Sequence, residues 1–359
     1  MKNLKISSLL AALFFAPALL LCAQTAAPKT AKPAVKKPAA KPAPKSAVVS
    51  PSTAAPAAQP KAGQAAAPAV DPFAEALEKL KSGDPVLRRE GADFIGQTRN
   101  AKGAPALVSA LSDESPRVRQ TAADALGMLT WREASPRLSE MLLKDVDANV
   151  RQQAAISLSY IMDPASAPSL VKALKDSSPA VRYSALHTLA VMKYSPAENE
   201  IIALLPSADA NTRRGAISAL GLLQSKKAVP ALAEALKDPD QYVRLEAVKA
   251  LGNIGDASFS KEITELLAPA EQPQLRIEAA LALAKMEKND GLLTAYEFAK
   301  SPELSLKSQA LNVIAAVGAA RSLQLVEEIY AAEKDPSAKS MLDFARQRLM
   351  ARLKVQEKK

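Results

Sequence analysis

A ten-residue phrase that recurs at a fixed spacing constrains the fold of this chain more than any other feature. It reads VRQTAADALG at 118–127, VRQQAAISLS at 150–159, VRYSALHTLA at 181–190 and VRLEAVKALG at 243–252. Such a period is typical of repeat architectures, in which each unit buries its apolar face against its neighbours. Aligning the basic residue of the phrase gives nine units separated by 31 or 32 residues, at Arg88, Arg119, Arg151, Arg182, Arg213, Arg244, Arg276, Lys307 and Lys339.

Each unit has the pattern of two helices and lacks the alternation expected of a strand. Proline recurs near the start of the first helix, where a missing N–H is tolerated, at Pro105, Pro136, Pro168 and Pro230. An aspartate recurs in the turn before the second helix, where it can accept hydrogen bonds from free N–H groups, at Asp113, Asp145, Asp176 and Asp238. The pattern predicts an all-α fold, a right-handed α-solenoid of about nine two-helix repeats over residues 71–355.

The unit from Asp113 to Gly127 carries the motif D-x-x-x-x-V-R-x-x-A-A-x-x-L-G most completely, and first helices share the phrase P-x-L-x-x-A-L-x-D. On these residues the array resembles the HEAT-repeat family, in the short bacterial form also found in phycobilin lyases. The resemblance extends from Asp71 to about Lys354, and it implies scaffolding and partner binding. Units 1, 8 and 9 depart from the motif, as terminal units of an array usually do.

Helical geometry places the recurring arginine in the apolar stripe. At about 100° per residue, the valine before it, the alanines three and four residues later and the leucine seven residues later fall on an arc centred near the arginine. A guanidinium there must be paired, since an unpaired buried charge costs several kcal/mol. We therefore expect a structural ladder between successive units, built from Arg119, Arg151, Arg182, Arg213, Arg244 and Arg276 with Asp113, Asp145, Asp176 and Asp238.

The binding surface is predicted on the opposite side of the same helices. Second helices usually line the concave side of a solenoid, and their solvent-facing residues form its default binding surface. The solvent-facing positions precede the arginine by two residues or follow it by two, five or nine. They give a mixed polar and apolar patch typical of protein recognition, with the candidate residues Thr121, Asp124, Gln153, Ile156, Tyr160, Ser184, His187, Ser218, Tyr242, Glu246 and Lys249.

Charge is divided unevenly along the chain. Residues 1–70 hold nine lysines and no acid, so +9 of the formal net charge of +10 lies there. The remaining residues are nearly neutral and show no phosphate-binding basic stripe, which argues against a nucleic-acid partner.

The first 70 residues predict an export signal followed by a linker. Residues 1–23 have two lysines, an apolar run and then small and polar residues, as in a secretory signal peptide cleaved after Ala23. Lipidation at Cys22 is the alternative, although the stretch before it has a bulky leucine where a lipobox normally has Gly, Ala or Ser. Residues 24–70 are almost entirely Ala, Pro and Lys, a composition that predicts a disordered spacer. The expected location is the bacterial periplasm or cell envelope.

Catalytic signals are weak. His187 is the only histidine and Cys22 the only cysteine, so the array has no zinc-ligand set, and it contains no Gly-rich phosphate loop. We expect no enzyme activity and no cofactor.

Three functions follow from these patterns. The first is an exported, non-catalytic scaffold that binds a protein partner through its concave face. The second is a lyase-like accessory enzyme of the phycobilin-lyase type, which the family resemblance implies. The third is a tether to the cell wall or membrane, in which the linker lysines contact an anionic envelope polymer or lipid.

Overall fold

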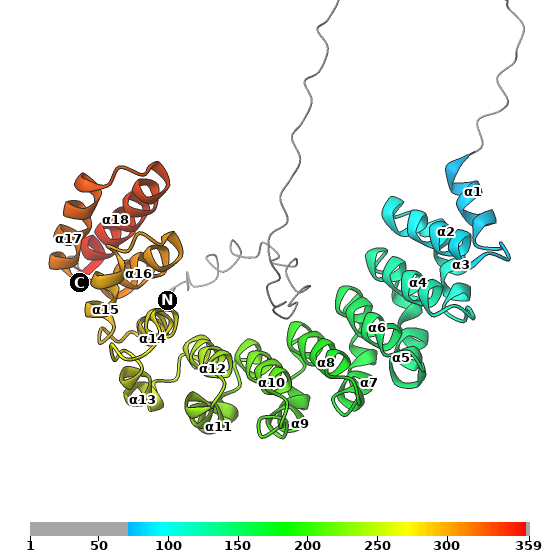
Figure 1. Cartoon of the computed structure of the whole chain (residues 1–359), viewed down its shortest axis with the longest axis horizontal. Coiled ribbons are helices and arrows are strands. Elements are labelled where there is room, and N and C mark those ends of the chain that lie inside the picture. Colours follow the sequence, from blue (N-terminus) through cyan, green and yellow to red (C-terminus); the bar gives the residue numbers. More distant parts are fainter. Residues whose placement is uncertain (1–70, 357–359) are drawn as a thin grey trace, which may run out of the picture. The chain divides into compact units, whose positions relative to one another are not determined.

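The computed structural model describes residues 71–356 as a continuous stack of helices (Figure 1). The predicted signal peptide, Cys22 and the predicted linker lie outside the described residues. Between residues 71 and 356, none of the helices combines the length and the apolar character needed to cross a bilayer.

The described helices form nine helix pairs in chain order, each an αα-hairpin. The first helices of the pairs are α1 (Pro72–Lys79), α3 (Ala104–Ala110), α5 (Ser135–Lys144), α7 (Ala167–Ala173), α9 (Glu198–Ile202), α11 (Val229–Glu234), α13 (Ser260–Glu265), α15 (Leu292–Phe298) and α17 (Ala320–Ala332). The second helices are α2 (Pro85–Thr98), α4 (Pro116–Met128), α6 (Ala148–Ile161), α8 (Pro179–Val191), α10 (Ala210–Leu223), α12 (Gln241–Ile254), α14 (Pro273–Lys285), α16 (Leu304–Val317) and α18 (Pro336–Gln356). Short 3-10 turns precede or extend several first helices: Ala101–Gly103, Arg132–Ala134, Pro164–Ser166, Ser195–Ala197, Lys226–Ala228, Ala235–Lys237 and Ala257–Phe259.

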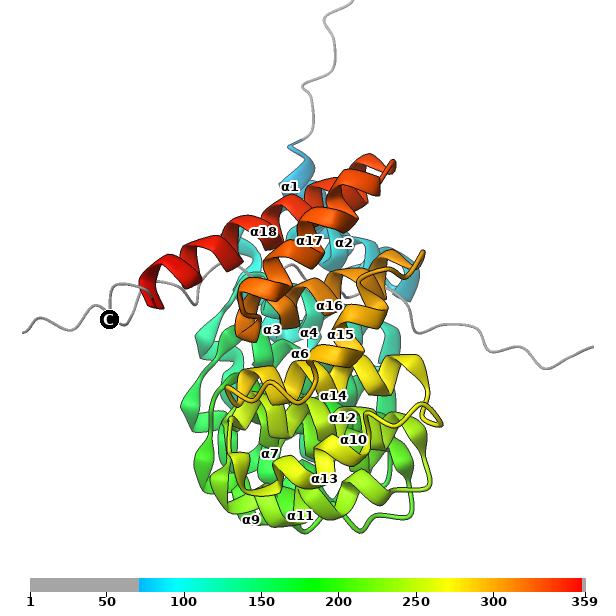
Figure 2. The same cartoon turned by 90° about the vertical axis from the view of Figure 1, so that its left-hand side faces the viewer.

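The helices of the array form two layers. Each second helix packs against the second helices before and after it, from α2 through to α16, and also against the first helix of its own unit. The second helices lie on the inner, concave side of the array and the first helices on the outer side (Figure 1). In the turned view α14, α12 and α10 lie one below another, and α13 and α11 lie below them (Figure 2). This is the all-helical, sequence-adjacent packing of a solenoid.

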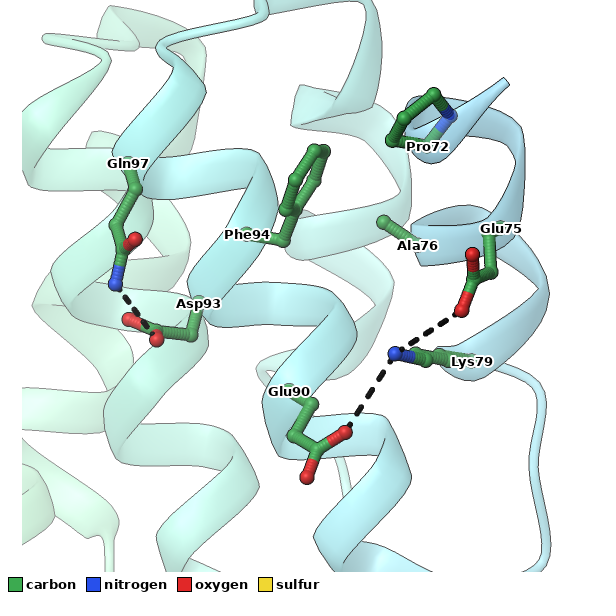
Figure 3. Close-up of a pocket in the computed structure, with 8 residues that line it drawn as sticks. All are labelled: Pro72, Glu75, Ala76, Lys79, Glu90, Asp93, Phe94 and Gln97. Carbon is green, nitrogen blue, oxygen red and sulfur yellow. Dashed lines mark hydrogen bonds and ion pairs between the residues drawn. The ribbon is translucent and has the colours of Figure 1, made fainter. Parts of the chain in front are cut away.

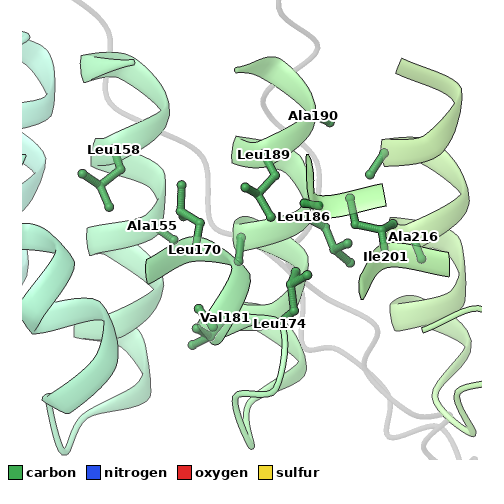
Figure 4. Close-up of a cluster of buried hydrophobic side chains, with 14 of the residues drawn as sticks. Ala155, Leu158, Leu170, Leu174, Val181, Leu186, Leu189, Ala190, Ile201 and Ala216 are labelled. Atoms are coloured by element: carbon green, nitrogen blue, oxygen red, sulfur yellow. The ribbon is translucent and has the colours of Figure 1, made fainter. Parts of the chain in front are cut away.

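The core is built from small and branched apolar side chains that repeat in every unit. Around α6 to α9, Leu158, Leu170, Leu186, Leu189 and Ile201 are almost completely buried and lie between the two layers (Figure 4). One apolar cluster extends from α1 to α14, and a second extends from α14 to α18. The solenoid therefore has no separate central core, and each unit depends on its neighbours for burial.

Local sequence explains where the helices begin. Proline occupies the first turn of α3, α5, α7 and α11, as the prolines in the repeat predict. Asp147, Asp209 and Asp240 cap α6, α10 and α12 by accepting backbone N–H groups.

A left-handed residue follows each of the second helices from α2 to α14. It lies eleven positions after the recurring arginine, and only one of the seven residues is a glycine, Gly255 with φ +72°. Among the others is Thr130, a β-branched residue held at φ 49°. Such residues store strain, because the left-handed region costs an L-residue about 1–2 kcal/mol.

Thr130→Gly is expected to raise the free energy of unfolding by about 1 kcal/mol. Glycine removes the steric cost of the positive φ, and its greater chain entropy offsets only part of the gain. Urea denaturation followed by circular dichroism measures the change. Gly255→Ala is the matched control and should shift the midpoint in the opposite direction; a stability loss in Thr130→Gly would show that the threonine side chain matters more than its backbone conformation.

Candidate functional site

The recurring arginines bind the aspartates of the following unit. Arg119 donates from Nε and Nη2 to the two carboxylate oxygens of Asp145, at 2.7 and 2.8 Å, and its Nη1 donates to the carbonyl of Asp113 at 2.9 Å. The Asp145 carboxylate also accepts the backbone N–H of Asp147 at 2.9 Å. The same two-pronged geometry joins Arg88 to Asp113, Arg151 to Asp176 and Arg213 to Asp238. Each bond holds the turn of one unit against the turn of the next.

Three arginines have partners that the repeat motif does not indicate. Arg182 donates to Thr212 Oγ1 at 2.9 Å and to Asp209 at 3.4 Å, because Ser207 stands where the ladder aspartate would be. Arg244 lies 3.6 Å from Glu271, in a turn with no aspartate.

Arg276 completes this set. It pairs with Glu297 at 2.6 Å, and its guanidinium carbon lies 5.0 Å from the centre of the Phe298 ring. In all three units the acidic partner lies at a different sequence position from the ladder aspartate. A search for aspartate at a fixed spacing therefore misses Asp209, Glu271 and Glu297.

Ion pairing lowers the pKa of the ladder aspartates. Burial alone would raise the pKa of Asp176, but hydrogen bonds from Arg151 and from the backbone N–H of Ser178 outweigh it. Asp113, Asp145 and Asp238 show the same direction and the same causes. These carboxylates are structural groups that stay ionised.

The concave face holds most of the predicted binding residues at its surface. Tyr160 and Tyr242 are about half exposed, and His187 is exposed. Half-buried positions on the same face are Thr121, Asp124, Gln153, Ile156, Ser218, Glu246 and Lys249. Ser184 is an exception to the prediction: it is only 6% exposed and packs inside the array. It lies between neighbouring second helices, so it offers a partner no direct contact.

Asp124 lies in a partly desolvated part of this face. Burial raises its pKa, the nearby Asp93 carboxylate raises it further, and a 2.8 Å hydrogen bond from Gln153 Nε2 opposes both effects. Its carboxylate therefore has a neutral partner, in contrast to the ladder aspartates.

Two residues that helical spacing placed outside the binding stripe also belong to the concave face. Tyr183 is half exposed, and Arg214 stacks on Tyr242, with its guanidinium carbon 5.7 Å from the ring centre. Both residues follow a ladder arginine directly in the sequence. A Cβ on Gly215 would lie 3.0 Å from the Tyr183 ring, so the glycine makes room for that ring across the helix boundary. In the sequence, the glycine at position 215 is the feature that indicates a bulky side chain of the neighbouring unit packing there.

Glu278 on α14 is a third residue that the sequence did not single out. It lies two positions after Arg276, at a concave position, yet it is only 4% exposed. Burial raises the pKa of its carboxyl group; Lys249 and Lys285 oppose this shift, and Glu246 adds to it. Keeping this group ionised is unfavourable for folding.

Glu278→Gln is expected to raise the free energy of unfolding at pH 8 by about 1–2 kcal/mol, because the amide avoids the cost of burying a charge. The pKa of Glu278 is raised in the folded protein, so the wild type loses stability as pH rises through that pKa and the buried carboxyl group ionises. The difference in unfolding free energy between the two proteins should therefore shrink towards pH 4, where the carboxyl group is protonated. Urea denaturation at pH 4 and pH 8 measures the effect. Glu246→Gln, at the equivalent half-buried position of α12, is the control. A destabilised Glu278→Gln variant would show that the carboxylate has a structural partner.

A shallow pocket of about 290 Å³ lies between α1 and α2 (Figure 3). Lys79 crosses it, 3.2 Å from Glu75 and 3.6 Å from Glu90, while Gln97 donates to Asp93 at 2.8 Å (Figure 3). Its charged groups already satisfy one another, so the pocket is the junction between two helices of the first unit.

Few side chains in the described part of the chain are candidates for catalysis or metal binding. His187 stands alone, and partial desolvation lowers its pKa. Within residues 71–356, histidine, cysteine, aspartate and glutamate side chains nowhere gather in threes with a geometry that could hold a metal ion.

The comparisons with known proteins agree with the paired helices. The family model for HEAT repeats matches residues 70–159, 135–201 and 198–268, which together exceed half of the chain. The chain belongs to the HEAT-repeat family. This HEAT-repeat protein also resembles the solved structure of YibA from Escherichia coli, with a TM-score of 0.53 and 22% identity over 73% of this chain and 97% of that one. At that identity the likeness concerns the fold alone.

Two curated proteins are similar to part of the array. The phycocyanobilin lyase subunit alpha of Nostoc sp. is 38% identical over 108 residues, which are 28% of this chain and 39% of the lyase subunit. The deoxyhypusine hydroxylase of Candida glabrata is 35% identical over 78 residues, which are 21% of this chain and 24% of the hydroxylase. This HEAT-repeat protein therefore aligns with less than half the length of either relative.

Proposed function

We propose that this HEAT-repeat protein is a non-catalytic scaffold that binds a protein partner through its concave face. The observation that carries the proposal is a row of exposed apolar side chains at one position, nine residues after the recurring arginine, on four consecutive second helices. We call this row the concave strip; its members are Met128, Tyr160, Val191 and Leu222. Tyr183 and Tyr242 lie on the same face and are also exposed. A contiguous apolar surface with tyrosines is typical of protein-binding sites.

Site-specific crosslinking tests this proposal. The photoreactive residue benzoylphenylalanine, placed at Val191 or Leu222 in the full chain, should give discrete protein adducts in living cells. Val146, which is 91% exposed in the turn before α6, is the control position and should give none of these adducts. The adducts should also disappear when Tyr160, His187 and Tyr242 are all changed to alanine. Adducts that form equally from Val146, or that survive the triple substitution, would contradict the assignment of the concave face.

The partial match to a phycocyanobilin lyase subunit favours one second candidate, an accessory enzyme of the lyase type. The match covers 28% of this chain and 39% of the lyase subunit. An absorbance titration with a linear tetrapyrrole distinguishes the two functions: the scaffold proposal predicts an unchanged spectrum, and a saturable spectral shift would favour the enzyme.

We also propose that the scaffold is exported and tethered by its basic N-terminal segment. The signal-like pattern of residues 1–23 and the seven lysines of residues 24–70 support this. Mass spectrometry of the mature N-terminus separates cleavage after Ala23 from lipidation at Cys22. If deletion of residues 24–70 left sedimentation with cell walls unchanged, the tether role would be lost.

A further inference from the structure

The charged groups of the concave face are distributed in a way that suggests what it binds. Acidic side chains lie on this face at both ends of the concave strip, Asp93 and Asp124 on one side and Glu246 and Glu278 on the other. The three second helices between them, α6, α8 and α10, contain no acidic residue at all within their bounds. At the concave positions of these three helices the titratable or charged side chains are Tyr160, Tyr183, His187 and Arg214.

Arg214 differs from every ladder arginine in its surroundings. Its neighbour Arg213 makes four hydrogen bonds, two of them to Asp238. In the described part of the chain, Arg214 makes no hydrogen bond and has no carboxylate within 4 Å, and its enclosed Nε has no partner. The terminal nitrogens of the guanidinium are not enclosed in this way. A charged donor without an acceptor, on a face that exposes apolar side chains, is a site that an acceptor would complete.

One aromatic ring lies against the guanidinium of Arg214. The guanidinium stacks on Tyr242 of the next unit, a contact that orients the planar group without neutralising it. The Tyr183 ring packs against Gly215, the residue next to Arg214. Arg214 thus contacts one half-exposed tyrosine, and a second half-exposed tyrosine packs against the residue that follows it. Arginine and tyrosine are among the residue types that contribute most to the affinity of protein interfaces.

We propose that Arg214 anchors a carboxylate side chain, aspartate or glutamate, of a partner segment that lies across α8, α10 and α12. This proposal rests on the protein-binding function above and specifies the chemistry of the partner. A single guanidinium matches one carboxylate with two parallel hydrogen bonds. A phosphorylated residue carries nearly two charges and normally requires a cluster of arginines, which this face lacks. Apolar residues beside the carboxylate then cover Val191 and Leu222.

Peptide selection on the full chain tests the proposal without a known partner. A random 12-residue phage library is selected against the wild-type protein, and the selected peptides are synthesised for fluorescence anisotropy. The expected consensus has Asp or Glu next to apolar residues. Arg214→Ala should weaken binding of the leading peptide at least tenfold. Arg214→Lys should keep only part of the wild-type affinity, because lysine lacks the two-pronged geometry.

A matched arginine and a matched peptide provide the controls. Arg117→Ala removes an exposed arginine of the concave face, on α4, and should change affinity less than twofold. A peptide with its acid changed to Gln should bind the wild type at least tenfold more weakly, yet should bind Arg214→Ala about as well as the original peptide does. This coupling places the carboxylate on Arg214.

The outcomes separate this inference from the protein-binding function itself. Peptides that lose binding to the Tyr160, His187 and Tyr242 triple-alanine variant, but bind Arg214→Ala like the wild type, overturn the role of Arg214 and leave the concave face as the binding surface. A consensus rich in Lys or Arg, or one without charge, also overturns it. If no selected peptide depends on the concave face, both proposals fail.

Discussion

Changing Arg151 to alanine is expected to lower the free energy of unfolding by about 3 kcal/mol. The substitution removes both hydrogen bonds to Asp176, at 2.7 and 2.8 Å, and the bond to the carbonyl of Asp145 at 2.9 Å. It leaves the Asp176 carboxylate largely buried between two units without the cation that hydrogen-bonds to it, and only the charge of Arg182 remains nearby. Urea denaturation followed by circular dichroism measures the loss.

Two further variants test the reason for this loss. Arg137→Ala removes a solvent-exposed arginine paired with Glu140 on α5, and it should cost less than about 0.5 kcal/mol. Combining Arg151→Met with Asp176→Leu should cost less than Arg151→Ala alone, because no unpaired charge remains. Equal losses from Arg151→Ala and Arg137→Ala would show that the ladder does not hold the units together.

The ladder also predicts acid sensitivity with a definite sign. The native pKa of Asp176 is lowered, so its contribution to stability is complete above the ordinary carboxyl pKa of about 4 and is lost as pH falls through the native value. Wild-type stability should therefore fall steeply below about pH 4, and the combined Met and Leu variant should fall less.

Changing Gly221 to alanine is expected to lower the free energy of unfolding by about 2 kcal/mol. A Cβ at this position would lie 2.8 Å from both Cα and Cβ of Ala250, so α10 and α12 would have to separate. Intrinsic helix propensity predicts the opposite sign, since alanine in a helix is more favourable than glycine by about 1 kcal/mol. The urea midpoint decides between the two effects.

Gly83 provides the control for this substitution. A Cβ there would meet no atom within 4 Å, so Gly83→Ala should leave the midpoint unchanged or raise it slightly. If Gly221→Ala were also neutral, the close approach of the second helices would not depend on the glycines at this repeat position.

The helix pairs and their solenoid packing could be predicted from the sequence because the repeat imposes them. The fixed spacing of the arginine, the proline at the start of first helices and the helical period of the apolar residues each indicate helix pairs, and the structure is all-helical over the residues it describes. The glycines eight residues after the arginine predict close helix contacts, and Gly96, Gly127, Gly221 and Gly252 each face a small residue of the next second helix.

The candidate site was less predictable because it depends on contacts between units. An ideal helical projection treats one helix at a time, so it counted Ser184 as exposed although neighbouring helices bury it. It passed over Tyr183, whose ring reaches across the helix boundary to Gly215. Glu278 lies two residues after Arg276, at a position that the projection assigns to solvent, yet it is only 4% exposed.

The central claim is that the recurring arginines build the array and the variable residues between them bind the partner. Measuring both the urea midpoint and the affinity for one selected peptide, in Arg151→Ala and in the Tyr160, His187 and Tyr242 triple-alanine variant, tests this claim most directly. We expect Arg151→Ala to lose stability but, where still folded, to bind the peptide like the wild type. The triple variant should keep its midpoint within experimental error and lose binding at least tenfold. A triple variant that binds normally, or an Arg151→Ala protein that is fully stable but no longer binds, would contradict the claim.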